Sequence, residues 1–182
     1  YTRFASEDAH EGMRAFLANR PAEFKHRGVQ APQRFPAMAI DNESFELLLA
    51  SVQRFVRERL IPAEDAVEEQ DLVPADLIED MKAMGLFGLT VPEEYGGIGL
   101  SVSQEVQVNH ELGRTAPAFR SVFGTNIGIG SQGILMVGTP EQKAEYLPRI
   151  ASGELIISFA LTEPDAGSDA GSLKTSARLD GD

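Results

Sequence analysis

From Ser44 onward, apolar residues recur at helical spacing, and this pattern constrains the fold more than any other feature of the sequence. Residues three or four positions apart lie on one face of an α-helix, where they are buried together. The first such pattern is interrupted at Ile61-Pro62, because proline lacks the N–H that a helix interior needs. Its apolar face consists of Phe45, Leu48, Leu49, Val52, Phe55 and Val56.

Further helix signals follow in order along the chain. Pro74 is typical of a first helical turn, and Gly85 predicts a left-handed stop behind an inward face that consists of Leu77, Ile78, Met81 and Met84. After a loop over 91–99, Ser101 and Gln104 have capping-box spacing and predict a helix to about Gly113. Thr139 and Gln142 repeat that spacing around Pro140, and the helix they begin should end near 151–153.

A small-residue segment, 118–138, also has a helical pattern but contains Gly124, Gly128, Gly130 and Gly133. Each glycine costs a helix up to about 1 kcal/mol relative to alanine, so close backbone packing or a ligand wall explains them better. Helix packing alone remains an alternative. The letters of 128–133 also satisfy a dinucleotide-binding fingerprint, but a genuine one follows a strand and begins a long helix, and this context provides neither.

The chemistry is expected in the stretch 155–178. Residues 155–161 form an apolar run of strand length, and 172–179 alternate apolar and polar residues, so we predict two strands. Between them, Pro164 fixes one backbone angle, and the small residues at 166–168 leave the main chain open to a ligand. Such a loop suits a flat heterocycle and a phosphate. An ordinary polar connection between two strands explains it equally well.

Residues 159–169, FALTEPDAGSD, resemble the flavin-binding signature of acyl-CoA dehydrogenases. Two upstream segments, VPEEYGG at 91–97 and GTPEQK at 138–143 followed by Gly153-Glu154, also resemble that family and occur in its order. The main departure is Asp165, where a small residue is commoner. An acid there would lie near a pyrophosphate and weaken its binding.

The resemblance implies a mainly α fold: the N-terminal helical-bundle domain of an acyl-CoA dehydrogenase, followed by the first strands of a truncated β domain. It implies FAD as cofactor, with Phe159, Leu161 and Thr162 at the isoalloxazine and with Gly167 and Ser168 at the pyrophosphate. Ser168 would also contact the acyl-CoA substrate. The family removes the substrate α-proton with a glutamate from a later domain, so we expect no catalytic residue within 1–182 and no activity from these residues alone. An electron-transfer flavoprotein as electron acceptor and a homo-oligomer are implied as partners.

The N-terminal region is predicted to be a separate unit. Residues 4–25 are similar to the C-terminal end of enoyl-CoA hydratases of the crotonase family, which implies a fusion of two β-oxidation enzymes. We therefore divide the chain into a tail helix at 1–28, a linker at 29–43 that contains Pro32 and Pro36, a helical domain at 44–154, and the start of a β domain at 155–182.

Composition excludes several classes of function. With 28 acidic and 16 basic residues the net charge is −12, which argues against nucleic acid or an anionic membrane surface as partner. There is no cysteine, which fits a reducing cytoplasm, and no apolar run long enough to span a membrane. The three histidines lack ligand spacing, so no metal site is expected. A non-catalytic helical module that docks a partner chain remains the alternative function.

Overall fold

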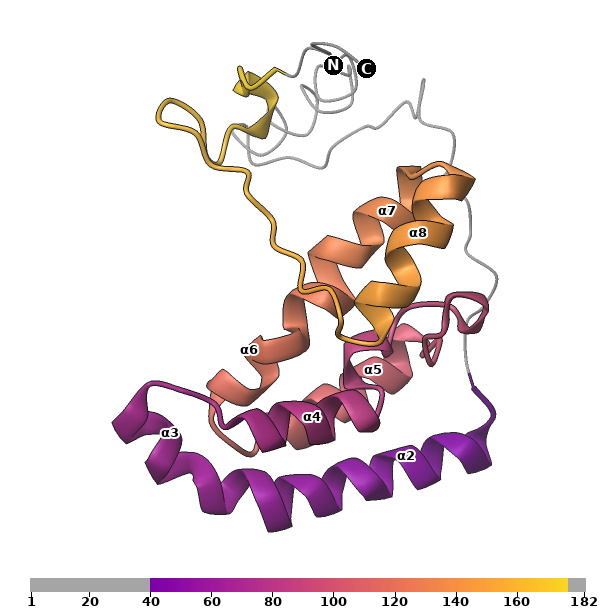
Figure 1. Cartoon of the computed structure of the whole chain (residues 1–182), viewed down its shortest axis with the longest axis vertical. Helices are drawn as coiled ribbons and strands as arrows, with labels where there is room; N and C mark the ends of the chain where they lie inside the picture. The colour runs from indigo at the N-terminus through magenta and orange to yellow at the C-terminus, as the bar shows by residue number, and fades with distance from the viewer. Residues whose placement is uncertain (1–39, 177–182) are drawn as a thin grey trace, which may run out of the picture. The chain divides into compact units, whose positions relative to one another are not determined.

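The structure is a computed structural model, and it describes residues 40–176 (Figure 1). The chain divides into two compact units. The larger unit is described from residue 40 to 159 and is entirely helical apart from its connections. The smaller unit is described from residue 160 to 176. The predicted tail helix at 1–28 and most of the predicted linker lie outside the described residues.

Helix α2 (Asn42–Phe55) begins the larger unit. Asp41 caps it, because its carboxylate accepts the Ser44 N–H at 2.9 Å. The sequence predicted an interruption at Ile61-Pro62, but the helical path continues there. It changes its hydrogen-bond pattern through a π-helical turn (Val56–Leu60) and a 3-10 turn (Ile61–Ala63) and leads into α3 (Glu64–Gln70). In the π turn the Ile61 N–H donates to Val56 O, five residues back, so the missing N–H of Pro62 falls where the chain is changing helix type.

The next helices begin and end where local signals predicted. Helix α4 (Ala75–Ala83) follows Pro74, and Gly85 takes the left-handed conformation at φ 73°. A 3-10 turn (Leu86–Gly88) follows Gly85, and a second 3-10 turn (Glu93–Tyr95) lies in the predicted loop 91–99. Helix α5 (Val102–Leu112) has the predicted capping box: Ser101 Oγ accepts the Gln104 N–H, and the Gln104 side chain accepts the Ser101 N–H.

The glycine-containing segment forms α6 (Pro117–Thr125), a π-helical turn (Asn126–Gly130) and α7 (Ser131–Val137). Its helices kink at Gly128, whose φ of −109° and ψ of −120° are not helical. An added Cβ would collide with Ile157 at Gly130 and with the Arg120 side chain at Gly124, so both glycines are closely packed. At Gly128 and Gly133 an added Cβ would meet nothing within 4 Å, so close packing does not explain these two, and the ligand wall stays a prediction. No strand precedes 128–133 among residues 40–176, which agrees with rejecting the dinucleotide fingerprint.

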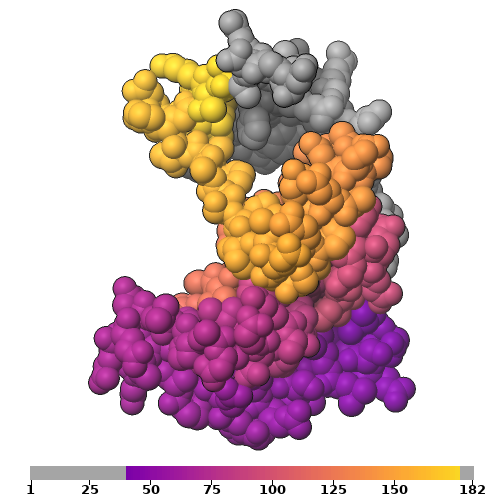
Figure 2. Space-filling view, in the orientation of Figure 1, coloured from indigo at the N-terminus to yellow at the C-terminus, as the bar shows by residue number. Residues whose placement is uncertain are grey.

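Helix α8 (Pro140–Ala151) completes the larger unit, and Thr139 and Gln142 form its predicted capping box. Helix α2 packs on α5, α5 contacts α6, and α7 packs on α8. Residues of α2, α3 and α4 form one continuous surface in the space-filling view (Figure 2). The largest completely buried side chains include Phe87, Phe119 and Phe123, and the rings of Phe87 and Phe123 are 6.0 Å apart between centroids. Burial of these apolar side chains is the main source of stability of the unit.

The fold is mainly helical, as predicted, but the two strands are not formed in the described residues. Residues 157–161 and 173–176 have no regular structure, and the remainder of the second predicted strand lies outside the described residues. A strand requires a second backbone to satisfy its N–H and C=O groups, and within 40–176 the single bridge joins Glu163 and Ala166. No helix within 40–176 has the length and apolar character to cross a membrane.

Candidate functional site

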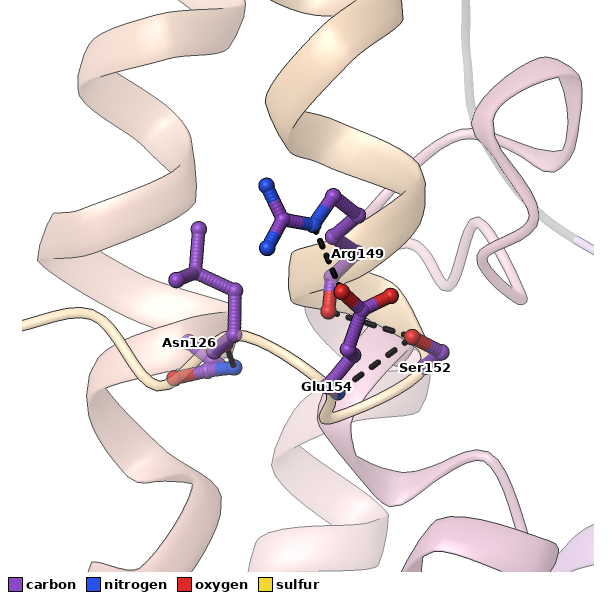
Figure 3. Close-up of polar contacts among 5 residues, drawn as sticks. Asn126, Arg149, Ser152 and Glu154 are labelled. Atoms are coloured by element: carbon purple, nitrogen blue, oxygen red, sulfur yellow. Dashed lines mark hydrogen bonds and ion pairs between the residues drawn. The ribbon is translucent and has the colours of Figure 1, made fainter.

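The predicted site begins at the end of α8, where the chain leaves the helix in a fixed direction. Gly153 is left-handed at φ 74°, and its N–H donates to Ile150 O at 3.1 Å. The Leu155 N–H then donates to Arg149 O at 2.9 Å. Arg149 also pairs with Glu154 at 2.8 Å, and Ser152 Oγ donates to Arg149 O at 3.1 Å (Figure 3). These contacts bind the segment that leaves α8, residues 153–157, to the last turn of the helix. We call these residues the exit segment.

Asn126 fixes the next residues of the exit segment from the other side. Its side chain is completely buried in the π turn between α6 and α7. The amide nitrogen donates to Ile150 O at 3.0 Å and to Leu155 O at 2.8 Å, and the amide oxygen accepts the Ile157 N–H at 3.2 Å. Figure 3 shows this side chain directed at the backbone that follows α8. One buried amide therefore satisfies Leu155 O and the Ile157 N–H, which have no strand partner in the described residues, and adds a donor to Ile150 O at the end of α8.

Gly130 allows this arrangement by its lack of a side chain. A Cβ at that position would lie 2.2 Å from Ile157 Cγ2 and 2.8 Å from Thr125 O. Both distances are far below van der Waals contact, so alanine at position 130 would displace the exit segment or the π turn. The glycine that sequence reasoning assigned to close packing thus packs against the segment that leads to the predicted cofactor loop.

The five predicted site residues are placed at the surface or half-buried. Phe159, in the larger unit, is 55% exposed. In the smaller unit Thr162 and Ser168 are exposed, and Leu161 and Gly167 are half-buried. An added Cβ on Gly167 would meet only Thr162 Cγ2, at 3.8 Å, so Thr162 and Gly167 are neighbours with open space beside them. The structure thus brings together Thr162 and Gly167, with Ser168 next in the chain.

Glu163 makes hydrogen bonds to two separate parts of the described residues of the smaller unit. Its N–H donates to Ala166 O at 2.8 Å and its C=O accepts the Ala166 N–H at 3.3 Å, so Pro164 and Asp165 form a tight turn. Its carboxylate accepts the Lys174 N–H at 2.8 Å, the Thr175 N–H at 2.7 Å and the Thr175 hydroxyl. The side chain therefore joins the turn to a segment eleven and twelve residues later.

These three donors lower the pKa of Glu163, with the Thr175 hydroxyl as the largest cause and the Lys174 and Thr175 amides next. Hydrogen bonds to the ionised form of a carboxylate favour that form, so Glu163 is unprotonated at neutral pH. Three of its acceptor positions are already used by donors of Lys174 and Thr175. A carboxylate in this state is a poor proton acceptor from a substrate, and the chemistry of Glu163 is that of a structural anion.

Asp165, the departure from the family signature, has a cationic neighbour. Lys174 Nζ lies 3.3 Å from Asp165 Oδ2, and both side chains are about three-quarters exposed. Such an exposed pair contributes little to stability, but it reduces the negative charge that Asp165 would present to an anionic ligand. No sequence pattern predicts this pair, because nine positions separate the two residues.

Two residues that shape the site were missed in the sequence. Neither Glu163 nor Asn126 was predicted to be a site residue. A signal existed for Asn126, since it is a short amide within an apolar segment that has a helical pattern, and a buried polar side chain needs partners. No sequence spacing predicts the pairing of Glu163 with 174–175.

Comparison with known proteins shows which family the chain belongs to. Residues 42–154 match the family model described as "Acyl-CoA dehydrogenase, N-terminal domain". The chain belongs to the acyl-CoA dehydrogenase family. It is 43% identical over 149 residues to the (2S)-methylsuccinyl-CoA dehydrogenase of Cereibacter sphaeroides. The aligned region covers 81% of this chain and 27% of that protein. The family resemblance stated on the three sequence motifs is therefore confirmed, while nothing in these comparisons bears on the crotonase-like segment.

Two solved structures share the fold. A chain from a study of the electron-transferring flavoprotein of Acidaminococcus fermentans superposes with a TM-score of 0.69 at 33% identity, over 79% of this chain and 38% of that chain. An acyl-CoA dehydrogenase from Bacillus anthracis complexed with FAD superposes with a TM-score of 0.61 at 32% identity, over 80% and 24%. The 182 residues thus span about a quarter to two-fifths of the length of these acyl-CoA dehydrogenase relatives and structures.

Proposed function

We propose that the protein is an FAD-dependent acyl-CoA dehydrogenase, which introduces an α,β double bond into an acyl-CoA thioester, and that residues 1–182 supply part of its flavin site. The observation that carries the proposal is the loop in which the open backbone at Gly167 lies beside Thr162. The family membership of the preceding helices and the FAD in the Bacillus anthracis structure support it. When bound, FAD supplies the acceptor for the hydride that leaves the substrate β-carbon.

The residues present fit this cofactor. The exposed Thr162 hydroxyl would donate to the pyrimidine edge of the flavin, with Phe159 and Leu161 as apolar neighbours of the ring system. Gly167 and Ser168 would contact the pyrophosphate, because a backbone without a side chain permits close approach and a hydroxyl donates to phosphate oxygens. Ser168 would also contact the acyl-CoA.

Within this proposal, proton removal from the substrate is assigned to a glutamate outside 1–182. Glu163, the carboxylate of the flavin loop, accepts three hydrogen bonds and has a lowered pKa. A general base needs a free lone pair within reach of the proton and a pKa near the working pH. The lowered pKa of Glu163 lies far from neutral pH, so in this proposal the loop orients the cofactor and other residues carry out the acid–base chemistry.

Partners and organisation follow from the same proposal. An electron-transfer flavoprotein would reoxidise the cofactor, and the solved structure from a study of such a protein supports that choice. The proposal also includes a homo-oligomer and a cytoplasmic location. It keeps the division of the chain into 1–28, 29–43, 44–154 and 155–182. The similarity of 4–25 to crotonase-family hydratases adds a fusion with an enoyl-CoA hydratase, which would hydrate the double bond that the dehydrogenase forms.

The test uses the protein expressed from its complete reading frame. We expect a yellow protein whose flavin absorbance is bleached by an acyl-CoA. Thr162→Val should weaken FAD binding or slow reduction, since a flavin acceptor loses its partner at a cost of about 1–3 kcal/mol. Thr162→Ser keeps the hydroxyl and serves as the matched control. Equal FAD affinity and reduction rate in Thr162→Val and the control would contradict the assignment.

A non-catalytic helical module is the second candidate, and one surface feature favours it. Ile129 in the π turn and Met136 and Val137 in α7 are between 58% and 85% exposed. Exposed apolar side chains of this kind suit contact with another protein surface. A colourless protein that needs a partner chain for solubility would support this second function over the first.

A further inference from the structure

We propose that Glu163 is a positioning residue, whose carboxylate holds the loop 162–168 in the form that binds the flavin. The inference rests on the proposed function and adds to it a residue that contacts the loop rather than the cofactor. The structural basis is the convergence of three donors from Lys174 and Thr175 on one side chain of the loop.

The loop has few other restraints within the described residues. A backbone pair between Glu163 and Ala166 closes a four-residue turn, and Ala166 is the one residue of the loop that is buried. The ion pair between Asp165 and Lys174 is exposed and is screened by water. The carboxylate of Glu163 therefore supplies the hydrogen bonds that connect this turn to 174–175.

This connection bears directly on the cofactor residues, because Thr162 precedes Glu163 in the chain. Gly167 lies against Thr162, as the distance of 3.8 Å from its added Cβ to Thr162 Cγ2 shows. Fixing the turn at Glu163 thus fixes the two positions that would contact the ring and the pyrophosphate. A loop ordered before binding loses less conformational entropy on binding, and this raises affinity without a new contact to the ligand.

The negative charge of Glu163 is needed, because all three of its partners are donors. Glutamine would keep one acceptor oxygen, but its NH₂ group would face the N–H of Lys174 or the donors of Thr175. Among residues 40–176, the other charged groups in the sequence around the turn are Asp165, Asp169 and Lys174. Lys174 directs its ammonium at Asp165, and Asp169 accepts the Ser172 hydroxyl, so none of these groups replaces Glu163 as acceptor.

The first experiment measures FAD affinity by titration of the apoprotein from the complete reading frame. We expect Glu163→Gln to weaken FAD binding about tenfold and Thr175→Val about threefold, because charge-assisted hydrogen bonds are lost. Thr175→Ser keeps the hydroxyl and should stay within about twofold of the unmodified protein. In Glu163→Gln the further change Thr175→Val should add little, since the two residues act through one contact. Glu46→Gln removes the same charge from an exposed position of α2 and should change nothing.

The second measurement needs no cofactor. Amide hydrogen exchange of the apoprotein should show Lys174 and Thr175 protected, and Glu163→Gln should reduce that protection by about fivefold or more. The protection should persist down to the ordinary glutamate pKa of 4.5 and disappear only as the pH falls through the lowered pKa of the folded protein. This pH profile separates a charge-dependent contact from general destabilisation of the loop.

The outcomes distinguish the two proposals. If the unmodified protein binds FAD and Glu163→Gln binds it equally well, the positioning role is overturned and the proposed function stands. If unmodified and variant proteins alike fail to bind FAD, the proposed function is overturned and this inference with it. Weaker binding in Glu163→Gln together with lost amide protection and an intact Glu46→Gln control supports the positioning role.

Discussion

The larger unit and the smaller unit are each stabilised internally by a different kind of interaction. The helical unit buries large apolar side chains such as Phe87 and Phe123 completely, and polar contacts mainly determine where its helices begin and end. The described part of the smaller unit buries one alanine and is arranged around hydrogen bonds to Glu163. Apolar burial stabilises without specifying direction, whereas hydrogen bonds specify geometry at modest net stability. The larger unit thus depends on apolar burial for its stability, and the described part of the smaller unit depends on directed hydrogen bonds for its geometry.

The sharpest test of apolar burial as the source of stability is to remove one buried and one exposed phenyl ring from the larger unit. Phe87→Ala should lower the free energy of unfolding by about 3–5 kcal/mol, because it leaves a cavity in a completely buried site. Phe159→Ala removes the same ring from a 55% exposed position and should change stability by less than about 1 kcal/mol. Urea denaturation measures both. Comparable losses in the two variants would show that residues around Phe159 belong to the core.

A smaller effect is expected at Asn126, where a polar group acts inside the apolar unit. Asn126→Ala should lower the free energy of unfolding by about 2–4 kcal/mol, since Leu155 O and the Ile157 N–H lose their buried partner. Gln107→Ala, in which an exposed side chain donates only to Ser103 O, is the matched control. Equal stability of the two variants would mean that water replaces the Asn126 amide without cost.

Helix capping should contribute less again. Ser101→Ala removes the acceptor of the Gln104 N–H and should cost about 1 kcal/mol in the free energy of unfolding. Ser103→Ala removes a hydroxyl that lies 3.2 Å from Ser101 Oγ but does not cap the Gln104 N–H, and it should cost less than half of that. A larger effect at Ser103 than at Ser101 would contradict the capping box as the reason why α5 begins there.

The smallest effect on folding is expected in the smaller unit itself. Asp165→Asn removes an exposed ion pair with Lys174 and should change the free energy of unfolding by less than about 0.5 kcal/mol. FAD affinity should rise slightly, because an acid near the pyrophosphate is neutralised. Weaker FAD binding in Asp165→Asn would instead make the contact with Lys174 a necessary part of the loop.

The features that the sequence predicted correctly are those that depend on near neighbours. The caps at Ser101 and Thr139 require a partner three residues away, and the left-handed stop at Gly85 requires only its own backbone. The predicted strand at 155–161 required a distant partner strand, and the side chain of Asn126 satisfies part of that backbone instead. The same distance explains why Glu163 and Lys174 were not paired. The cofactor roles of Phe159, Leu161, Thr162, Gly167 and Ser168 stay predictions.

The three contacts of Asn126 also restrict how the sequence can change over evolution. The position requires two N–H donors for carbonyl groups and one acceptor for an N–H, at the end of a single methylene. Aspartate has the right length but brings oxygen toward two carbonyl oxygens, glutamine has the right groups but one carbon too many, and serine does not reach all three partners. No single substitution conserves the arrangement. A relative without asparagine at this position should therefore also differ around Gly130 and in the segment after Gly153, because the three sites can change only together.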